Sequence, residues 1–197
     1  PLIGWVVASM DTIPANMNPF DLGSPVPWML FFLIFAWTPP HFWALALYRS
    51  GEYGKVGVPM LPDVKGPDRT LKESKFYCIL LLLIGSVPCF WPGSGLPLAW
   101  AFIAGYLTLW YSISVWRIDP REELDSNGRM PLAFASFMRS LGYLAWMFIA
   151  FVYIVAVPKE HIWYYSGLLL IVIPLVNELA IGWKNSAGKN RKVLNSE

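Results

Sequence analysis

Charged residues are scarce in this sequence, and their scarcity excludes an ordinary soluble domain. Only 14% of the 197 residues are Asp, Glu, Lys or Arg, whereas 56% are hydrophobic. A soluble domain would be about a quarter charged. The charges also avoid the long apolar runs, so the sequence predicts an integral membrane protein. We expect the lipid bilayer as its surroundings and no nucleic acid as a partner.

Cysteine is also scarce. The chain has 2 cysteines, Cys78 and Cys89, and both fall in one apolar run. Cysteines in such a run are usually small residues that face lipid or protein, and a disulfide or metal pair is the less favoured interpretation.

Tryptophan and proline, in contrast, are frequent. The chain has 11 Trp and 17 Pro, which fits interfacial aromatic residues and interrupted membrane helices. We predict an all-α fold, a polytopic transmembrane helical bundle with about five complete spans plus an N-terminal partial helix. The partial helix covers residues 1–9, and the spans are expected at about 26–49, 76–92, 97–116, 132–157 and 163–183.

The chain is predicted to form a single transmembrane domain over residues 1–197, with a basic cytoplasmic tail at 184–197. It begins with an apolar run, PLIGWVVA, that is shorter than the about 20 residues needed to cross a bilayer. The run also lacks the basic region of a signal peptide. We therefore expect the chain to be the C-terminal part of a longer protein.

The basic residues predict the orientation in the membrane. If the spans alternate, all of the 15 Lys and Arg residues except Lys159 lie on one side. By the positive-inside rule, that side is the cytoplasm, or the matrix of a mitochondrion. The short loops favour the inner (cell) membrane of a bacterium, with the mitochondrial inner membrane as the alternative.

The stretch from Trp37 to Lys65 combines an apolar helix with a polar loop. Pro39 and Pro40 lack backbone donors, so we expect them to break the helix. In hydrocarbon the freed carbonyls need partners, so such a break is buried against protein or lines a cavity. His41 follows at membrane depth, where an ionisable residue is a functional candidate. The alternative, that His41 only donates to a freed carbonyl, stays open.

The loop after this helix carries both signs of charge close together. Carboxylates and water hold Mg²⁺ together with substrate phosphates, and Lys or Arg neutralises the remaining phosphate charge. A metal-bridged diphosphate is therefore one interpretation, and an ordinary solvated loop is the other. If the helix resumes after the break, His41, Tyr48 and Glu52 share one face by their i, i+7, i+11 spacing. The GVPMLP segment is expected to fold back against the helix ends.

Aromatic residues surround the expected break. The ring faces of Trp37, Phe42 and Trp43 would suit a cation or a flat macrocycle, although a packing cluster explains them equally well. In the last expected span, Glu178 either reaches toward the cytoplasmic side or contacts a ligand. His161 lies in a short external connection and is assigned no role.

The segment WTPPHFWALALYRSGEYGKVGVPMLPDVKG resembles the protohaem IX farnesyltransferases (haem O synthases), a family of UbiA-type intramembrane prenyltransferases. Its pattern is similar to W-x-P-P-H-F-W-A-L-A-L followed by D-Y-x-x-x-G-V-P-M-L-P. The opening PLIGWV also resembles the segment that precedes this pattern. The likeness is dense over about residues 1–72 and specific over 37–62, and only the hydrophobic layout matches beyond.

The resemblance implies a helical bundle around a central cavity open to the membrane. It also implies transfer of a farnesyl group from farnesyl diphosphate to a vinyl group of haem B, with Mg²⁺ assisting. The product, haem O, serves terminal oxidase biogenesis, so haem A synthase or terminal oxidase assembly would be downstream partners.

By position in the resemblance, Glu52 replaces the aspartate of the second acidic motif and becomes the candidate metal ligand. His41 matches a histidine that would touch the haem or its iron, or hold the broken helix. The candidate catalytic residues are Glu52, Arg49, Tyr53 and Lys55. The candidate substrate-binding residues are Trp37, His41, Phe42, Trp43, Tyr48, Lys65 and Arg69.

This sequence departs from the family pattern in three places. Glu52 is one methylene longer than Asp. The first acidic motif, of the N-x-x-x-D-x-x-x-D type, would precede Pro1, so we expect this chain alone to lack half of its metal site and to be inactive. The expected span at 163–183 lies beyond the usual last helix of the family. Two alternatives remain: a UbiA-type prenyltransferase with another aromatic acceptor, such as a quinone precursor or a chlorophyll-like ring, and a non-catalytic haem-binding assembly factor.

Overall fold

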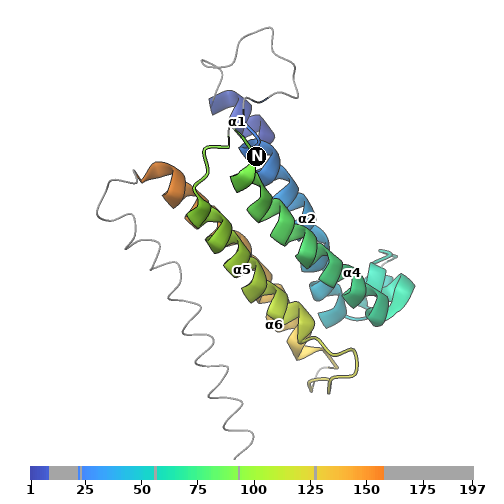
Figure 1. Cartoon of the computed structure of the whole chain (residues 1–197). Helices are drawn as coiled ribbons and strands as arrows, with labels where there is room; N and C mark the ends of the chain where they lie inside the picture. The colour runs from blue at the N-terminus through green and yellow to red at the C-terminus, as the bar shows by residue number, and fades with distance from the viewer. Residues whose placement is uncertain (9–21, 23, 56, 93, 127, 158–197) are drawn as a thin grey trace, which may run out of the picture. The chain divides into compact units, whose positions relative to one another are not determined.

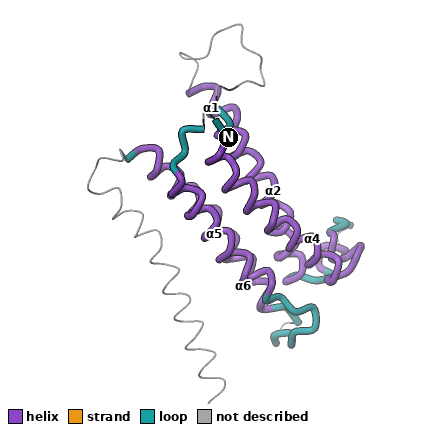
Figure 2. Tube along the Cα trace, in the orientation of Figure 1, coloured by secondary structure: helices purple, strands orange, loops and turns teal. Residues whose placement is uncertain are grey.

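The computed structural model describes residues 1–8, 22, 24–55, 57–92, 94–126 and 128–157. Figure 2 shows helices and loops there, and no strand is present among these residues. The elements are α1 (Leu2–Ala8), α2 (Val26–Tyr48), α3 (Glu52–Lys55), α4 (Leu61–Ser86), the 3₁₀ helix η1 (Val87–Phe90), α5 (Leu98–Trp116) and α6 (Pro131–Ala156). The predicted all-α fold is confirmed.

Four of these helical segments are long and apolar enough to cross a bilayer: α2, α4 with η1, α5 and α6. They agree with the expected spans near 26–49, 76–92, 97–116 and 132–157, and they make this an integral membrane protein. The expected span at 163–183, the tail at 184–197, Lys159, His161 and Glu178 lie outside the described residues.

The chain divides into two compact units, residues 1–149 and 150–197. The first unit contains α1 to α5 and most of α6. Within it, α2 packs against α4, and α4 packs against α5 (Figure 1). The described part of the second unit is the end of α6, where the Val157 N–H donates to the Tyr153 carbonyl over 3.0 Å.

Helix α2 passes through Pro39 and Pro40 without a break, so the expected interruption is wrong. The two prolines remove the donors that would reach the carbonyls of Phe35 and Ala36. In an apolar environment, an open break would leave still more backbone groups without partners. A continuous helix limits that loss. Pro40 is also fully buried, so packing supports the local geometry.

Helix α4 begins earlier than the hydrophobic pattern suggests. It starts at Leu61, so the region expected to be a polar loop at 50–72 contains α3 and the first turns of α4. Gly66, with φ 80° and ψ 165°, divides α4 into a short first part and a long second part. An ion pair between Arg69 and Glu73, four residues apart, supports the polar turns that follow. Hydropathy alone missed these turns because their exposed side chains are charged.

The GVPMLP segment folds back only in part. Pro62, its last residue, is buried, and Met60 and Leu61 are half-buried, whereas Val58 is exposed. A small apolar cluster lies near the end of α2. It is made of Leu47, Leu71, Ile118, Met130 and Ala133, with Tyr48 packed against it. The cluster joins the ends of α2 and α6, and so it positions the polar residues described next.

Candidate functional site

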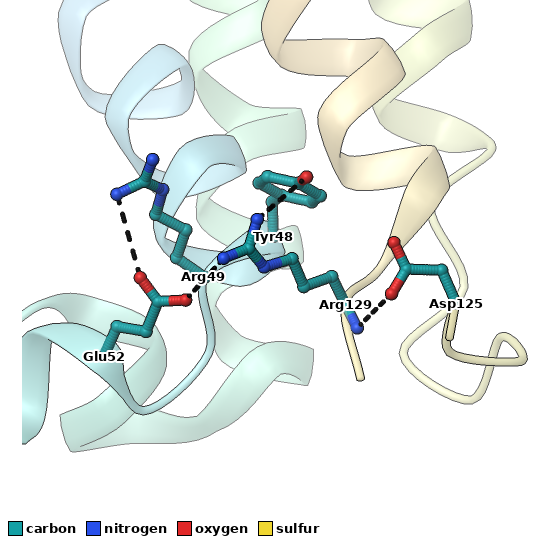
Figure 3. A network of polar contacts seen from close by, with 5 residues as sticks. All are labelled: Tyr48, Arg49, Glu52, Asp125 and Arg129. Carbon is teal, nitrogen blue, oxygen red and sulfur yellow. Dashed lines mark hydrogen bonds and ion pairs between the residues drawn. The ribbon is translucent and has the colours of Figure 1, made fainter. Parts of the chain in front are cut away.

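A polar network lies where α2 ends, and the guanidinium group of Arg129 is at its centre (Figure 3). Arg129 Nη2 donates to Glu52 Oε1 over 3.1 Å, and Nη1 donates to the Tyr48 hydroxyl over 3.3 Å. The guanidinium carbon also lies 5.2 Å from the centre of the Tyr48 ring. The second carboxylate oxygen of Glu52 is 3.7 Å from Arg49 Nη1. One carboxylate therefore holds two guanidinium groups.

The turn after α2 directs Glu52 toward this network. Gly51 has φ 77°, a left-handed conformation that glycine adopts without steric cost. The Glu52 N–H donates to the Arg49 carbonyl over 3.0 Å, and the Gly51 N–H donates to Asp63 Oδ1 over 3.3 Å. The turn reverses the chain, and α3 then begins at Glu52. The expectation that Glu52 continues the helix face of His41 and Tyr48 is therefore wrong, although the chain still returns Glu52 to the Arg129 that Tyr48 contacts.

Arg129 is held by a second turn, just before α6. The Arg129 N–H donates to Asp125 Oδ1 over 2.9 Å, and the Asp125 N–H donates to the Arg129 carbonyl over 2.9 Å. Met130, the next residue, enters the apolar cluster. The backbone of Arg129 is thus fixed on both sides. Sequence reasoning missed this residue because nothing in the loop spacing distinguishes it from Arg117 or Arg121.

The network is charged and only partly buried. The relative exposure is 48% for Arg49, 44% for Glu52 and 34% for Arg129, and ion pairs exposed to this degree contribute only about 0–1 kcal/mol to stability. The hydrogen bond to Tyr48 and the nearby Glu52 carboxylate raise the pKa of Arg129. Arg49 and Arg129 flank the Glu52 carboxylate, and Asp125 adds a second carboxylate beside the Arg129 backbone. Each guanidinium has several further donors.

A column of aromatic rings leads from the middle of α2 to this network. Trp37 stacks on His41 with 4.3 Å between ring centres, and His41 stacks on Phe137 at 4.7 Å. Phe137 stacks on Phe134 at 6.3 Å, and Phe134 lies 4.8 Å from Tyr48. We call these five residues the aromatic column. Its first two rings and its last ring belong to α2, and the two between them belong to α6. The last ring contacts Arg129.

Ser140 determines the hydrogen-bonding state of His41. The Ser140 hydroxyl donates to the Phe137 carbonyl over 2.6 Å and lies 2.6 Å from His41 Nδ1. Because a hydroxyl has a single proton, Ser140 must accept at His41, so Nδ1 carries a hydrogen. In the neutral ring, Nε2 is then an acceptor, and it has no hydrogen-bond partner among the described residues. The partner of His41 is therefore this hydroxyl and not a carbonyl freed by the prolines.

The other candidate residues are placed apart from the network. Phe42 meets His41 edge-on at 5.3 Å, and Trp43 meets Tyr77 edge-on at 5.6 Å. Arg69 pairs with Glu73. In the described part of the chain, the side chains of Tyr53, Lys55 and Lys65 make no hydrogen bond or ion pair with Glu52, Arg49 or Arg129.

The donor set near Glu52 fits an open metal site and not a closed one. Among the described residues, no three His, Cys, Asp or Glu side chains gather into a group that could hold a metal ion. Mg²⁺, however, often uses one or two carboxylates together with water and substrate phosphates. Glu52 can serve as such a single protein ligand.

The helices that can span a membrane define an integral membrane protein. Its arginine–carboxylate network lies at the end of the aromatic column, and together they form a candidate site for a ligand with an anionic group and an apolar chain. Residues 1–141 match the profile of the UbiA prenyltransferase family. The match covers well over half of the chain, so the chain belongs to this family.

Curated relatives agree with the family match. The chain is 38% identical over 138 residues to a protoheme IX farnesyltransferase of Bradyrhizobium sp. (strain BTAi1), covering 68% of this chain and 40% of the relative. It is 40% identical over 130 residues to a protoheme IX farnesyltransferase of Parvibaculum lavamentivorans, and this match covers 66% of this chain and 37% of the relative. It is 34% identical over 170 residues to a protoheme IX farnesyltransferase of Sinorhizobium fredii, and this match covers 85% of this chain and 47% of the relative. The chain thus spans less than half the length of these relatives. No solved structure matches it.

Proposed function

We propose that this protein takes part in the transfer of a farnesyl group from farnesyl diphosphate to a vinyl group of haem B, which gives haem O. The observation that carries the proposal is the network in which Arg129 joins Glu52 to Tyr48 at the end of the aromatic column. Family membership and the similarity to protoheme IX farnesyltransferases support it.

In this proposal the arginines bind the diphosphate. Arg129 and Arg49 point toward one carboxylate from two sides, so both guanidinium groups are oriented before substrate arrives. Charge-assisted hydrogen bonds from guanidinium to phosphate are strong and directional. The same bonds favour charge that develops on the leaving diphosphate. Before substrate binds, the Glu52 carboxylate thus positions the guanidinium groups of Arg49 and Arg129.

We propose Mg²⁺ as the cofactor, with Glu52 as its ligand on this part of the chain. When bound, the ion would neutralise part of the diphosphate charge. Its further ligands would come from the substrate, water and residues other than those described. Arg49, Tyr48 and Arg129 would then orient the diphosphate on its remaining sides.

The carbon chemistry would take place beside the aromatic column. The bond between farnesyl C1 and the diphosphate oxygen breaks, and the electron pair leaves with the diphosphate. The resulting allylic cation is stabilised by ring faces in an apolar surrounding. The terminal carbon of a haem vinyl group then forms a bond to farnesyl C1. Water adds to the new cation next to the macrocycle and releases a proton, which gives the hydroxyethyl-farnesyl side chain.

His41 would contact the haem in this scheme. Its ring is stacked between Trp37 and Phe137, so the edge of the ring, and not its faces, would meet a ligand. With Nδ1 bonded to Ser140, Nε2 is the nitrogen that could approach the haem or its iron. Haem O would then pass to haem A synthase or to terminal oxidase assembly.

We further propose that the protein lies in a bacterial cell membrane, with the network on the cytoplasmic side. The supporting observation is the asymmetry of the basic residues, of which only Lys159 falls on the opposite side of the expected topology. The three similar relatives come from bacteria.

The test uses the full-length natural protein in inverted membrane vesicles, which expose the cytoplasmic face. Haem B, farnesyl diphosphate and Mg²⁺ are added, and the products are identified by mass. We expect haem O from the parent protein and at least a tenfold lower yield from Glu52→Gln, because the uncharged amide cannot hold both arginines. Glu123→Gln is the matched control, since Glu123 is exposed and outside the network; its yield should equal that of the parent.

Three outcomes would contradict parts of the proposal. A prenylated product from another aromatic acceptor would keep the prenyl transfer and exclude haem B as the acceptor. Haem binding without any prenylated product would favour a non-catalytic assembly factor. Activity only in right-side-out vesicles would reverse the proposed orientation.

A further inference from the structure

An apolar groove lies between α4 and α5, distinct from the Glu52 network. Its volume is about 440 Å³, within the about 300–1,000 Å³ that ligand pockets occupy. Ile79 and Leu82 of α4 form one wall, and Leu109 and Ile113 of α5 form the other. Ile79, Leu109 and Ile113 are exposed to the surroundings, so the groove opens outward from this pair of helices.

The polar side chains in the groove are already bonded to their own helix. Thr108 Oγ1 donates to the Ala104 carbonyl over 2.7 Å, and Ser112 Oγ donates to the Thr108 carbonyl over 2.7 Å. The wall therefore offers mainly hydrocarbon to an occupant. No Asp or Glu lines the groove, so it provides no carboxylate for a metal-bridged diphosphate.

One end of the groove is basic and aromatic. Arg117 and Trp116 line it there, and the Lys75 ammonium lies 5.8 Å from the centre of the Trp116 ring. Lys75 precedes Ile79 and Leu82 by one and two turns of α4, so these three residues share a face. Arg117 forms no ion pair with any described residue.

The length of the groove fits one leaflet of a bilayer. From Lys75 to Leu82, α4 rises roughly 10 Å at 1.5 Å per residue. One leaflet of the hydrocarbon core is about 15 Å thick. Lys75 and Arg117 belong to the basic side of the expected topology, the side where anionic lipids attract Lys and Arg.

We propose that this groove binds an anionic phospholipid of the cytoplasmic leaflet. One acyl chain would lie between Ile79 and Leu82 on one side and Leu109 and Ile113 on the other. The phosphate would lie between Arg117 and Lys75, with Trp116 at the level of the headgroup. A prenyl diphosphate carries more charge and calls for a metal with carboxylate ligands, which this groove lacks and Glu52 offers. The inference does not depend on the proposed enzymatic activity.

The test is photo-crosslinking of the full-length protein in phosphatidylethanolamine vesicles. These vesicles contain a trace of phosphatidylglycerol or phosphatidylcholine with a diazirine in the acyl chain, and labelled peptides are located by mass spectrometry. We expect phosphatidylglycerol to label the face with Leu82, Leu109 and Ile113. Each basic side chain near an anionic headgroup contributes a factor of about five, so the preference over phosphatidylcholine should be about 25-fold for two.

Variants connect this labelling to the two cations. Lys75→Gln combined with Arg117→Gln should lower phosphatidylglycerol labelling to the phosphatidylcholine level, whereas Arg117→Lys should retain most of it, which separates loss of charge from loss of fold. Arg121→Gln removes an exposed cation outside the groove and should leave the labelling unchanged. Equal labelling by both lipids, full labelling of the double variant, or displacement of the probe by farnesyl diphosphate would overturn the proposal.

Discussion

At the scale of single residues, Ser140 hydrogen-bonds to two aromatic residues of α2, His41 and Trp37. It is fully buried and accepts from His41 Nδ1 while donating to the Phe137 carbonyl. These two bonds fix both the orientation and the tautomer of an imidazole inside a membrane helix. The carbonyl of Ser140 also accepts from Trp37 Nε1 over 2.9 Å. Residue 140 thereby secures two neighbouring rings of the aromatic column.

We predict that Ser140→Ala lowers the free energy of unfolding by about 1–3 kcal/mol, because the buried Nδ1–H of His41 loses its acceptor. If His41 contacts haem as proposed, the visible spectrum of bound haem B should change as well. Both are measurable on purified full-length protein, by denaturant unfolding in detergent and by haem titration. Ser140→Thr keeps the hydroxyl and should restore the spectrum.

Ser136→Ala is the matched control for this variant. Ser136 is also fully buried, and its hydroxyl lies 3.1 Å from that of Ser114 rather than near His41. Its removal should cost stability without altering the haem spectrum. A Ser140→Ala protein that keeps both its stability and its spectrum would show that the serine does not control His41.

The residues that the sequence could indicate were those inside one contiguous motif. His41, Arg49 and Glu52 lie within a dozen positions, and their types and spacing suggested chemistry. Their partners are far away in the chain: Arg129 is 77 residues from Glu52 and Ser140 is 99 residues from His41. Nothing in the local sequence marks such a partner. Packing of α6 against α2 brings them together, and periodicity does not specify which residues then meet.

At the scale of elements, hydropathy predicted the four described spans and, except for α4, their bounds to within one residue. The expected starts of the spans near 26, 97 and 132 lie within one residue of α2, α5 and α6. The start of α4 was missed because charged side chains cover its first turns. The break at Pro39 and Pro40 was predicted from a local rule about proline in helices. The membrane surroundings and the buried position of Pro40 override this rule, and the helix continues.

The division of α4 at Gly66 provides a test of backbone strain. Its φ of 80° and ψ of 165° lie in a region that essentially only glycine occupies, at a cost of about 1–3 kcal/mol for other residues. A Cβ at this position would meet nothing within 4 Å, so Gly66→Ala should destabilise the protein by that amount through conformation alone. Denaturant unfolding measures the change.

Gly105→Ala is the helical counterpart of Gly66→Ala. A Cβ at Gly105 would lie 3.7 Å from Leu82 Cδ1, an ordinary contact, so this substitution should raise stability by about 0.5–1 kcal/mol. Equal effects of the two substitutions would contradict the strained geometry at Gly66.

At the scale of the whole molecule, the described helices hold one polar network and one apolar groove at separate places. The network supplies two arginines and the Glu52 carboxylate, with Asp125 bonded to the Arg129 backbone. The chain covers 37–47% of the three relatives compared. The sequence predicted the membrane class, the family resemblance and the carboxylate of the network. It did not predict the aromatic column, because its rings come from two helices separated by about 90 residues and each ring alone is ordinary in a membrane helix.

The central claim is that Arg129 and Glu52 form the diphosphate end of a prenyltransferase site. Binding of farnesyl diphosphate to the full-length protein, compared between the parent and Arg129→Gln, tests it most directly. Loss of charge-assisted hydrogen bonds worth about 1.5–3 kcal/mol should raise the Kd roughly ten- to 150-fold. Arg129→Lys should be intermediate, because an ammonium group cannot bridge Tyr48 and Glu52 as a planar guanidinium does. Arg121→Gln should bind like the parent, and an unchanged Kd for Arg129→Gln would contradict the claim.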